Sequence, residues 1–461
     1  MGKVVVFTGQ AGTGKTYSLM QLLSEIIPHR EWLKFETILA LTFMHGSRRR
    51  LESNLKFVKK DFKVRYECST IDSFALTILN RFRSYLGIFK AIRPNEIISE
   101  NAFECFMNRE LIREKVTYLL QLDSVRKFIE NSYPYIVIDE FQDCTGTLLE
   151  IVKQLSTSTD ILIACDQFQQ LSDPENLEGM QWVAENQFEL NDLNSTGVKR
   201  TKNNKLLLTA TCLRTGNVTK GPKITIHPCP GAKGGFFPLA EYQLKANIHY
   251  NLAYGNIAII SPTQNGPFVN QLLKSLSKSY TYKKEPFKTI GPYNQLLGFD
   301  NYLDIHGLVK DLPKVALPKA ALKELKTKNN FVLNKCADRL LKRLSLRNFE
   351  TIPYEEFYYV LEQTAHTYDN FYRNENKAKL IFTTIHGAKN REFDNVIVLW
   401  PYNVPSDLLQ KRKLLYNAIT RAKRNVVVIV QNKSDKLEDL AKDNLFSLII
   451  DKSNDEESTS T

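Results

Sequence analysis

The chain has 461 residues, 43% of them hydrophobic, and a formal net charge of +12. This length suggests two to four domains, and the composition is that of a globular protein with a sizeable core. No apolar run reaches the ~18 residues of a membrane span, so we expect no membrane association of that kind. The seven cysteines are scattered without a CxxC pair, which argues against a zinc ribbon or an iron–sulfur cluster and favours a reduced, cytoplasmic setting.

The charge is unevenly distributed along the chain. Residues 451–461 hold one lysine against four acidic residues, so the remainder of the chain carries +15. An excess of this size favours a polyanionic partner, and a basic but otherwise ordinary surface is the alternative. We expect the acidic tail itself to be disordered.

The first expected element is a strand over Val4–Phe7, followed by a helix after the loop Gly9-Gln10-Ala11-Gly12-Thr13-Gly14-Lys15-Thr16. A strand, a glycine-rich loop and a helix in this order are typical of a phosphate-binding P-loop. The N–H groups of such a loop turn toward the phosphates, Lys15 can reach the β- and γ-phosphates, and the Thr16 hydroxyl can hold Mg²⁺. Only eight residues precede Gly9, so we expect no signal peptide.

Further apolar runs typical of buried strands recur along the chain, at 38–41, 135–138, 161–164, 257–260, 380–382, 396–399 and 426–430. Helical stretches separate them, which predicts an α/β protein with parallel sheets covered on both faces. Residues 76–130 and 286–375 read as mainly helical insertions that interrupt the first and second sheets. Ligands of such sheets bind at the carboxyl ends of the strands, where several of these runs end in polar residues.

One of these runs ends in Asp139-Glu140-Phe141-Gln142-Asp143. A hydrolytic NTPase needs one carboxylate on Mg²⁺ and a second that activates water. We assign Asp139 to the metal and Glu140 to the water. A solvated acidic turn is the alternative, but the preceding buried strand and the P-loop favour the catalytic interpretation.

With these residues in place, the chain resembles the UvrD/Rep/PcrA type of superfamily 1 helicase, in a compact form. The DEFQD segment is similar to the second Walker motif of that family. Further motifs follow in the family's order at 40–43 (Ia), 69–74 (Ib), 166–169 (III), 212–215 (IV), 384–393 (V) and 414–423 (VI). The resemblance implies two RecA-like domains, ATP and Mg²⁺ as cofactors, and 3′ to 5′ movement on single-stranded DNA.

The resemblance also implies roles for individual residues. Gln169 senses the γ-phosphate, Arg214 and Arg421 neutralise its charge, and Glu392 contacts the nucleotide. Both arginines lie beyond the first sheet, where they can close a cleft over ATP. The candidate nucleic-acid contacts are Thr42, Phe43, Arg48, Thr70, Ser73, Phe74, Thr384 and His386.

The implied domains are 1A over 1–75 and 131–210, a helical insertion 1B over 76–130, 2A over 211–285 and 376–450, a reduced basic helical insertion 2B over 286–375, and the tail over 451–461. Residues 310–347 hold eleven basic residues, which can either neutralise phosphates or form a solvated helical face.

Three departures from the family pattern affect these expectations. Leu213 stands where the family has a tyrosine that stacks on adenine, and the family's upstream glutamine motif is missing, so we expect poor discrimination between ATP and GTP. Asn390 replaces a glycine of motif V. Residues 170–174 replace the aromatic residues that follow motif III, so we expect ATP hydrolysis rather than processive unwinding to be the better supported activity.

The sequence leaves three functions open. The first is an ATP-driven motor on single-stranded DNA. The second is a nucleotide-controlled switch that binds nucleic acid and regulates a partner such as a nuclease, as in compact UvrD-like proteins of the Gabija antiphage defence type. The third is an enzyme that acts on RNA.

The P-loop and the acidic motif generate a first prediction. Lys15→Ala should abolish ATP turnover, because no other residue of the loop supplies an ammonium group to the phosphates. Glu140→Gln should bind nucleotide but fail to hydrolyse it, since a carboxamide cannot accept the proton of water. Steady-state phosphate release and nucleotide binding check both variants, and undiminished turnover in Glu140→Gln would contradict its assignment as the base.

Overall fold

The computed structural model describes residues 2–43, 51–56, 64–101, 104–171, 176–232, 235–263, 266–276, 280–282, 285–287, 309, 312–313, 315–328, 330–371 and 380–450. They form two compact units, one from the described parts of Met1–Val269 and Thr383–Thr461 and the other from those of Asn270–Phe382. The predicted tail, 451–461, lies outside the described residues, and the predicted domain boundaries stay a prediction.

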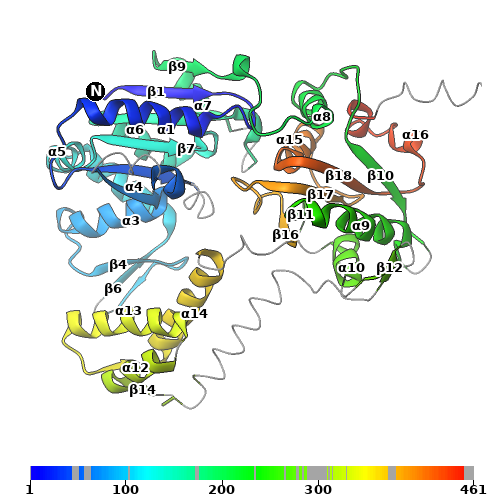
Figure 1. Cartoon of the computed structure of the whole chain (residues 1–461). Coiled ribbons are helices and arrows are strands. Elements are labelled where there is room, and N and C mark those ends of the chain that lie inside the picture. Colours follow the sequence, from blue (N-terminus) through cyan, green and yellow to red (C-terminus); the bar gives the residue numbers. More distant parts are fainter. Residues whose placement is uncertain are drawn as a thin grey trace, which may run out of the picture. The chain divides into compact units, whose positions relative to one another are not determined.

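The first unit contains two large parallel sheets (Figure 1). The strands of the first sheet are, in spatial order, β3 (Arg65–Thr70), β2 (Thr37–Thr42), β7 (Tyr135–Asp139), β8 (Asp160–Cys165), β1 (Val4–Thr8) and β9 (Glu189–Asp192). Every neighbouring pair in this sheet is parallel. The fold class predicted from the apolar runs is therefore confirmed.

The second sheet has the order β10 (Thr225–Pro230), β18 (Ala422–Asn432), β17 (Phe393–Trp400), β11 (Ile257–Ser261) and β16 (Leu380–Thr384). The pairs that join β10, β18, β17 and β11 are parallel. Strands β3, β9 and β10 escaped the sequence prediction. All three are edge strands with exposed or half-buried positions, so they need no continuous apolar run.

Both faces of the first sheet are covered, because alternate side chains of a strand point to opposite faces. Val5, Phe7 and other residues on one face pack against α1 (Lys15–Ile26). Val4, Val6 and others on the opposite face pack against α3 (Ile71–Phe82), α4 (Arg109–Gln121) and α6 (Gly146–Ser156). This double burial explains why the central strands read as uninterrupted apolar runs.

The predicted insertion at 76–130 contains helices and, in addition, a small sheet. Its helices are α4 and α5 (Asp123–Ser132), and its three strands are β4 (Ala91–Pro94), β6 (Glu104–Met107) and β5 (Ser99–Glu100). These strands have two to four residues, too short to produce a periodic signal in the sequence. Helix α7 (Glu178–Glu185) lies between β8 and β9 in the chain.

The helices around the second sheet are α8 (Asn204–Thr215), α9 (Pro238–Asn251), α10 (Pro267–Ser275), α15 (Leu408–Ile419) and α16 (Leu437–Leu440). Helix α9 contacts β10, β17 and β18, and α15 contacts β17 and α8. None of the described helices combines the length and the apolar composition that a bilayer span requires.

The second unit has its own core. Its described elements are α12 (Lys319–Leu325), α13 (Phe331–Arg347), α14 (Tyr354–Phe371) and the strand pairs β12 (Tyr280–Tyr282) with β13 (Glu285–Phe287) and β14 (Ala316–Pro318) with β15 (Thr351–Pro353). Fourteen buried residues of this unit, among them Leu317, Cys336 and Phe357, form one hydrophobic cluster.

Several basic residues of the 310–347 segment are engaged within this unit. Lys319, Lys326 and Arg343 pair with acidic side chains at 2.7–2.8 Å, and Arg339 donates to the Thr364 hydroxyl at 2.9 Å. Lys310 and Lys314 lie outside the described residues. These internal pairs favour the interpretation of the segment as a paired helical surface over that of a dedicated phosphate-binding stripe.

Candidate active site

The loop between β1 and α1 has the backbone shape of a P-loop. Gly12 and Gly14 adopt left-handed conformations with φ of 82° and 99°, which glycine tolerates and other residues rarely adopt. A Cβ on Gly12 would lie 2.8 Å from the Cβ of Arg200. The carbonyl of Gly12 accepts a hydrogen bond from the Lys199 N–H at 2.7 Å. This bond connects the P-loop to the segment between β9 and α8, which is distant in the sequence.

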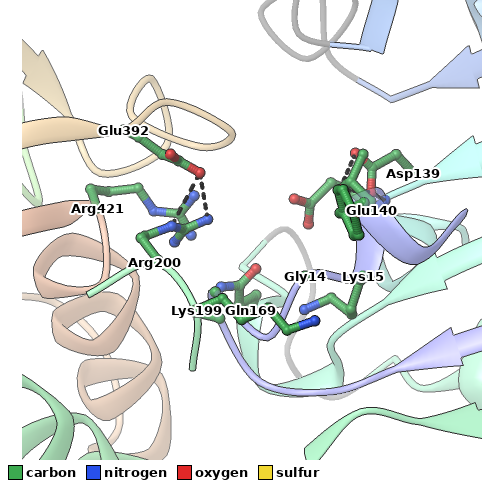
Figure 2. A pocket seen from close by; sticks show the side chains of 13 residues that line it. Gly14, Lys15, Asp139, Glu140, Gln169, Lys199, Arg200, Glu392 and Arg421 are labelled. Carbon is green, nitrogen blue, oxygen red and sulfur yellow. Dashed lines mark hydrogen bonds and ion pairs between the residues drawn. The ribbon is translucent and has the colours of Figure 1, made fainter. Parts of the chain in front are cut away.

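The side chain of Lys15 folds back over its own loop. Its Nζ donates to the carbonyl oxygens of Gly9 and Gln10 at 2.8 and 3.0 Å and lies 3.9 Å from Oδ2 of Asp166. Figure 2 shows this ammonium group at the wall of a cavity of about 340 Å³. It is therefore placed to exchange its carbonyl partners for phosphate oxygens.

Thr16 and Asp139 lie next to each other at the same wall. The Thr16 hydroxyl is 3.3 and 3.5 Å from the two carboxylate oxygens of Asp139. A hydroxyl and a carboxylate are the oxygen ligands with which Mg²⁺ is usually held beside a nucleotide. The donor set of these two residues thus fits a magnesium ion.

Glu140 follows β7 in a left-handed conformation, with φ of 62°. Such a backbone is unusual for a residue with a side chain and is often found at functional positions. Burial by itself raises the pKa of Glu140, but the charges of Lys389, Arg421 and Lys15 and a hydrogen bond from Gln142 together lower it. The carboxyl is therefore ionised at neutral pH and able to accept a proton.

The cavity brings together most of the nucleotide residues predicted from the sequence (Figure 2). The predicted residues that line it are Ala11, Gly12, Gly14, Lys15, Thr16, Asp139, Glu140, Gln169, Glu392 and Arg421. Glu392 and Arg421 directly precede β17 and β18, so the amino ends of the second sheet face the P-loop. Gly9, Gln10 and Thr13 belong to the same loop but do not line this cavity.

Sequence reasoning missed three further residues of the cavity wall, which are Tyr17, Lys199 and Arg200. The Arg200 guanidinium bonds to Glu392 at 3.0 Å and to the carbonyl of Thr420 at 2.7 Å. The basic pair Lys199-Arg200, in the segment between β9 and α8, was the feature of the sequence that could have indicated this position. The tyrosine directly follows Thr16, and 66% of its surface is exposed.

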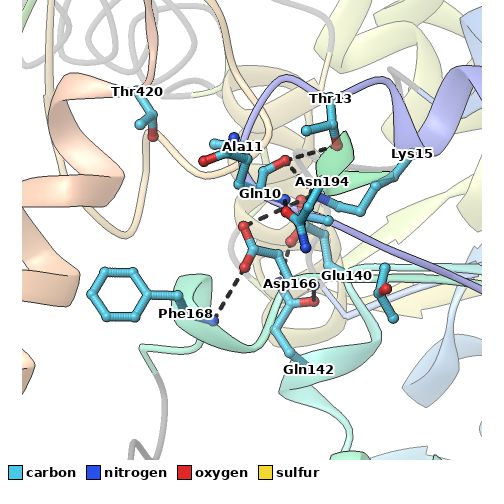
Figure 3. A network of polar contacts seen from close by, with 12 residues as sticks. Gln10, Ala11, Thr13, Lys15, Glu140, Gln142, Asp166, Phe168, Asn194 and Thr420 are labelled. Carbon is cyan, nitrogen blue, oxygen red and sulfur yellow. Dashed lines mark hydrogen bonds and ion pairs between the residues drawn. The ribbon is translucent and has the colours of Figure 1, made fainter. Parts of the chain in front are cut away.

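Arg214 lies on α8 and is not among the residues that line the cavity. Its guanidinium donates to Oδ1 of Asp166 at 2.8 Å and to the Tyr416 hydroxyl at 3.4 Å. Asp166 also accepts from the N–H of Phe168, as Figure 3 shows. Arg200 thus occupies the cavity wall beside Arg421, and the phosphate-binding role expected of Arg214 stays a prediction.

Leu213, expected at the place of an adenine-stacking ring, is fully buried. Asn390 occupies its position in motif V with φ of 61°. Asparagine is among the side-chain-bearing residues that enter the left-handed region most readily. The backbone shape that a glycine would allow is therefore kept despite the substitution.

A buried ion pair connects the two sheets beside the acidic motif. Nζ of Lys389 lies 2.6 and 2.9 Å from the carboxylate oxygens of Asp143, and both side chains are less than 10% exposed. Lys389 belongs to the loop that follows β16. The Tyr416 hydroxyl makes a second connection, since it accepts a hydrogen bond from the Ala11 N–H of the P-loop at 3.0 Å.

The candidate nucleic-acid residues have different environments. Phe74 is 1% exposed in the core and packs edge-on against Tyr133, so its ring offers no free face for a base. The expectation that it stacks on bases does not agree with this position. Phe43 is half-buried against the same core.

The remaining candidates lie at the ends of strands. Thr42 is buried at the end of β2. The Thr70 hydroxyl caps α3 by accepting from the Ser73 N–H at 3.1 Å. Thr384 ends β16, and the His386 side chain is exposed in the following loop. Arg48 lies outside the described residues.

Two family models match the chain. Residues 379–429 match the model of the UvrD-like helicase C-terminal domain, and residues 1–174 match the model of the AAA domain. No curated protein matches the chain. The first match covers Glu392 and Arg421 and the second covers the P-loop and Glu140, so together they confirm the resemblance that the motifs predicted.

The position of the arginines generates a second prediction. Arg200→Ala should lower kcat by about 10³-fold, as the loss of a phosphate-directed arginine does elsewhere. Arg214→Ala should lower it less, because its guanidinium bonds to Asp166 outside the cavity. Steady-state ATPase rates check this, with the exposed Arg424→Ala as a matched control at the parent rate. An undiminished ATPase rate in Arg200→Ala, together with a large loss of rate in Arg214→Ala, would show that Arg214 is the phosphate-directed arginine.

Proposed function

The chain belongs to the UvrD-like superfamily 1 helicases, ATP-hydrolysing enzymes that act on nucleic acid, and we propose that it is a motor that moves along single-stranded DNA. The family resemblance favours the 3′ to 5′ direction. The observation that carries the proposal is the cavity that groups Lys15 and Glu140 from the first sheet with Arg200, Glu392 and Arg421. In such a composite site, ATP is hydrolysed only when the residues of the first sheet and those around the second sheet come together, so hydrolysis is coupled to their movement.

In the proposed reaction, ATP lies in the cavity with its phosphates along the P-loop. Lys15 exchanges the carbonyls of Gly9 and Gln10 for phosphate oxygens. Thr16 and Asp139 would hold Mg²⁺, which when bound would supply positive charge to the phosphate oxygens.

Glu140 takes a proton from the water whose oxygen attacks the γ-phosphorus, and ADP leaves. Negative charge spreads over the γ-phosphoryl oxygens during this step. The guanidinium groups of Arg200 and Arg421 stabilise it, and Gln169, which follows β8 of the first sheet, also lines the cavity.

The Lys389–Asp143 pair supports a link between strand binding and hydrolysis. The loop that carries His386 leads directly to Lys389, and Asp143 lies three residues beyond Glu140. A strand that contacts this loop would therefore act on the segment that holds the catalytic carboxylate, through an ion pair with little solvent screening.

Tyr17 and Lys199 are the best candidates for holding the base of the nucleotide. The Lys199 ammonium lies 5.8 Å from the centre of the Tyr17 ring, and both residues line the cavity. An aromatic face and a cation can sandwich any base, because neither reads its hydrogen-bonding edge. This arrangement supports the expected weak choice between ATP and GTP.

The alternative is a nucleotide-controlled switch that binds nucleic acid and regulates a partner such as a nuclease. The burial of Phe74 favours it, because a processive motor needs exposed rings on which bases can step. The ATPase rate with and without single-stranded DNA, duplex DNA and RNA distinguishes the candidates. Turnover that rises only with single-stranded DNA supports the motor, and turnover that none of the three changes supports the switch.

The link between the loop and the catalytic carboxylate generates a third prediction. Lys389→Met removes the cation that lies beside a buried aspartate and should cost about 3–5 kcal/mol of folding free energy. The double variant Lys389→Met/Asp143→Leu removes both charges and should melt near the parent temperature, yet lose the stimulation of ATPase by single-stranded DNA. Lys389→Arg is the matched control and should keep it. Full stimulation in a stably folded double variant would rule out this link.

The base platform generates a fourth prediction. Tyr17→Ala should raise KM for ATP and for GTP alike, by about tenfold for ~1.4 kcal/mol of lost stacking. Hydrolysis assays with each nucleotide and with mixtures of both check this. A preference of the parent for ATP above about a hundredfold, or ~2.7 kcal/mol, would show that some residue reads adenine.

A further inference from the structure

A second cavity lies at the carboxyl ends of β17 and β18. Its volume is about 650 Å³, larger than that of the ATP cavity. It is lined by the ends of the two strands, by Lys411 of α15 and by residues 439–446 of the C-terminal segment. None of the functions considered so far uses it.

This cavity is distinct from the nucleotide site. The two share no lining residue. Glu392 faces ATP just before β17 begins, whereas Trp400 lines the second cavity where the strand ends. A strand of this length, at about 3.3 Å per residue, separates the two ends by roughly 23 Å.

The cavity combines an apolar floor with an exposed aromatic ring. Trp400 and Phe446 are each 3% exposed and meet edge to face, with ring centres 6.3 Å apart. Tyr402 at the rim is 53% exposed, and the Lys433 ammonium lies 5.8 Å from the centre of its ring. A ring of this kind beside a hollow can stack on an unpaired base.

The charge available to a ligand is positive. Asp439 bonds to Lys442 at 2.8 Å and accepts from the Ser434 hydroxyl, and Asp443 accepts from the N–H groups that follow it. Lys411 and Lys433 have no acidic partner within 4 Å in the described part of the chain. Two such ammonium groups at one hollow can neutralise a phosphate.

The cavity lies at the same edge of the second sheet as Thr384, one of the predicted nucleic-acid contacts. Thr384 lies at the carboxyl end of β16, which is two positions from β17 and three from β18 in the sheet order. Neighbouring strands are about 4.8 Å apart, so roughly 10–14 Å separate the cavity from Thr384. One nucleic-acid strand can reach both.

We infer that this cavity binds a nucleoside phosphate unit, with the base against Tyr402 and the phosphate at Lys411 and Lys433. The inference rests on the proposed function, in which the chain binds single-stranded DNA. The nucleoside phosphate unit is then one nucleotide of the bound DNA strand, and it binds at a point away from the ATP site. A free nucleotide has the same chemistry and is separated from the strand by the experiment below.

The test measures the affinity of the full chain for a fluorescent mixed-sequence DNA oligonucleotide by anisotropy, across a salt series. Tyr402→Ala should weaken binding by about tenfold through lost stacking. Lys433→Gln should reduce the slope of log affinity against log salt by about 0.7, the value for one phosphate contact on a single strand. Lys436→Gln is the matched control, since it removes the same charge from an exposed lysine outside the cavity, and should change neither quantity.

A second arm distinguishes the two sources of the ligand. Thymidine monophosphate is titrated against the oligonucleotide complex of the parent and of Tyr402→Ala. Displacement that requires Tyr402 identifies a site for free nucleotides, whereas no displacement, combined with the variant effects above, identifies a strand site. Either result supports the inference.

The outcomes also separate this inference from the proposed function. If the parent binds the oligonucleotide with a steep salt dependence and Tyr402→Ala, Lys411→Gln and Lys433→Gln all match it, the cavity does not hold a nucleotide and the motor proposal stands. If the parent fails to bind the oligonucleotide, the motor proposal and this inference fall together. All three substitutions are at exposed or half-buried positions, and thermal melting verifies that the variants fold.

Discussion

The ion pair between Lys389 and Asp143 joins two sheets that the sequence places about 250 residues apart. Both side chains are largely withdrawn from water, so the loss of either charge is expected to destabilise the contact. The pair fixes the loop after β16 against the short turn that follows Glu140. Lys389 also acts on the composite cavity, because its charge, together with those of Arg421 and Lys15, lowers the pKa of Glu140 against the effect of burial.

Several weaker contacts act at the same boundary. The Lys199 N–H bonds to the Gly12 carbonyl, the Tyr416 hydroxyl accepts from the Ala11 N–H, and Arg214 pairs with Asp166. Each contact connects a residue of the P-loop or of its neighbouring strand to a segment that follows the first sheet. The first two contacts hold Gly12 and Ala11, which line the cavity, whereas the Arg214–Asp166 pair lies outside it. The shape of the cavity is therefore linked to the relation between the two sheets.

The two edges of the second sheet have different chemistry. Its amino edge presents Glu392 and Arg421 to the P-loop, and its carboxyl edge carries Thr384 and the cavity bordered by Tyr402 and Lys433. Parallel strands impose this division, since all their carboxyl ends lie on one side. In the proposed motor, this sheet would hold a phosphate-directed arginine at one edge and the nucleic-acid strand at the other.

The sequence determined the parts of this protein whose chemistry is local. Glycine spacing, a lysine and a threonine define the P-loop, and an acidic pair after an apolar run predicts the residues for the metal and the water. The central strands were predictable because burial on both faces forces continuous apolar runs. The edge strands β3, β9 and β10 were not, because an edge is only partly buried and leaves no such pattern.

Only the tertiary structure decided which distant residues complete the site. Arg200 precedes helix α8 and lines the cavity, whereas Arg214 lies near the end of that helix and pairs with Asp166. The residues next to each arginine in the sequence do not indicate this difference. Phe74 matched a motif position but is held in the core by its neighbours. Tyr17 and Tyr402 had no predicted role, and Lys389 belonged to motif V without a role of its own, so the roles proposed for them rest on their positions in the structure. Such assignments depend on contacts between segments hundreds of residues apart, and local sequence patterns do not encode which of those segments meet.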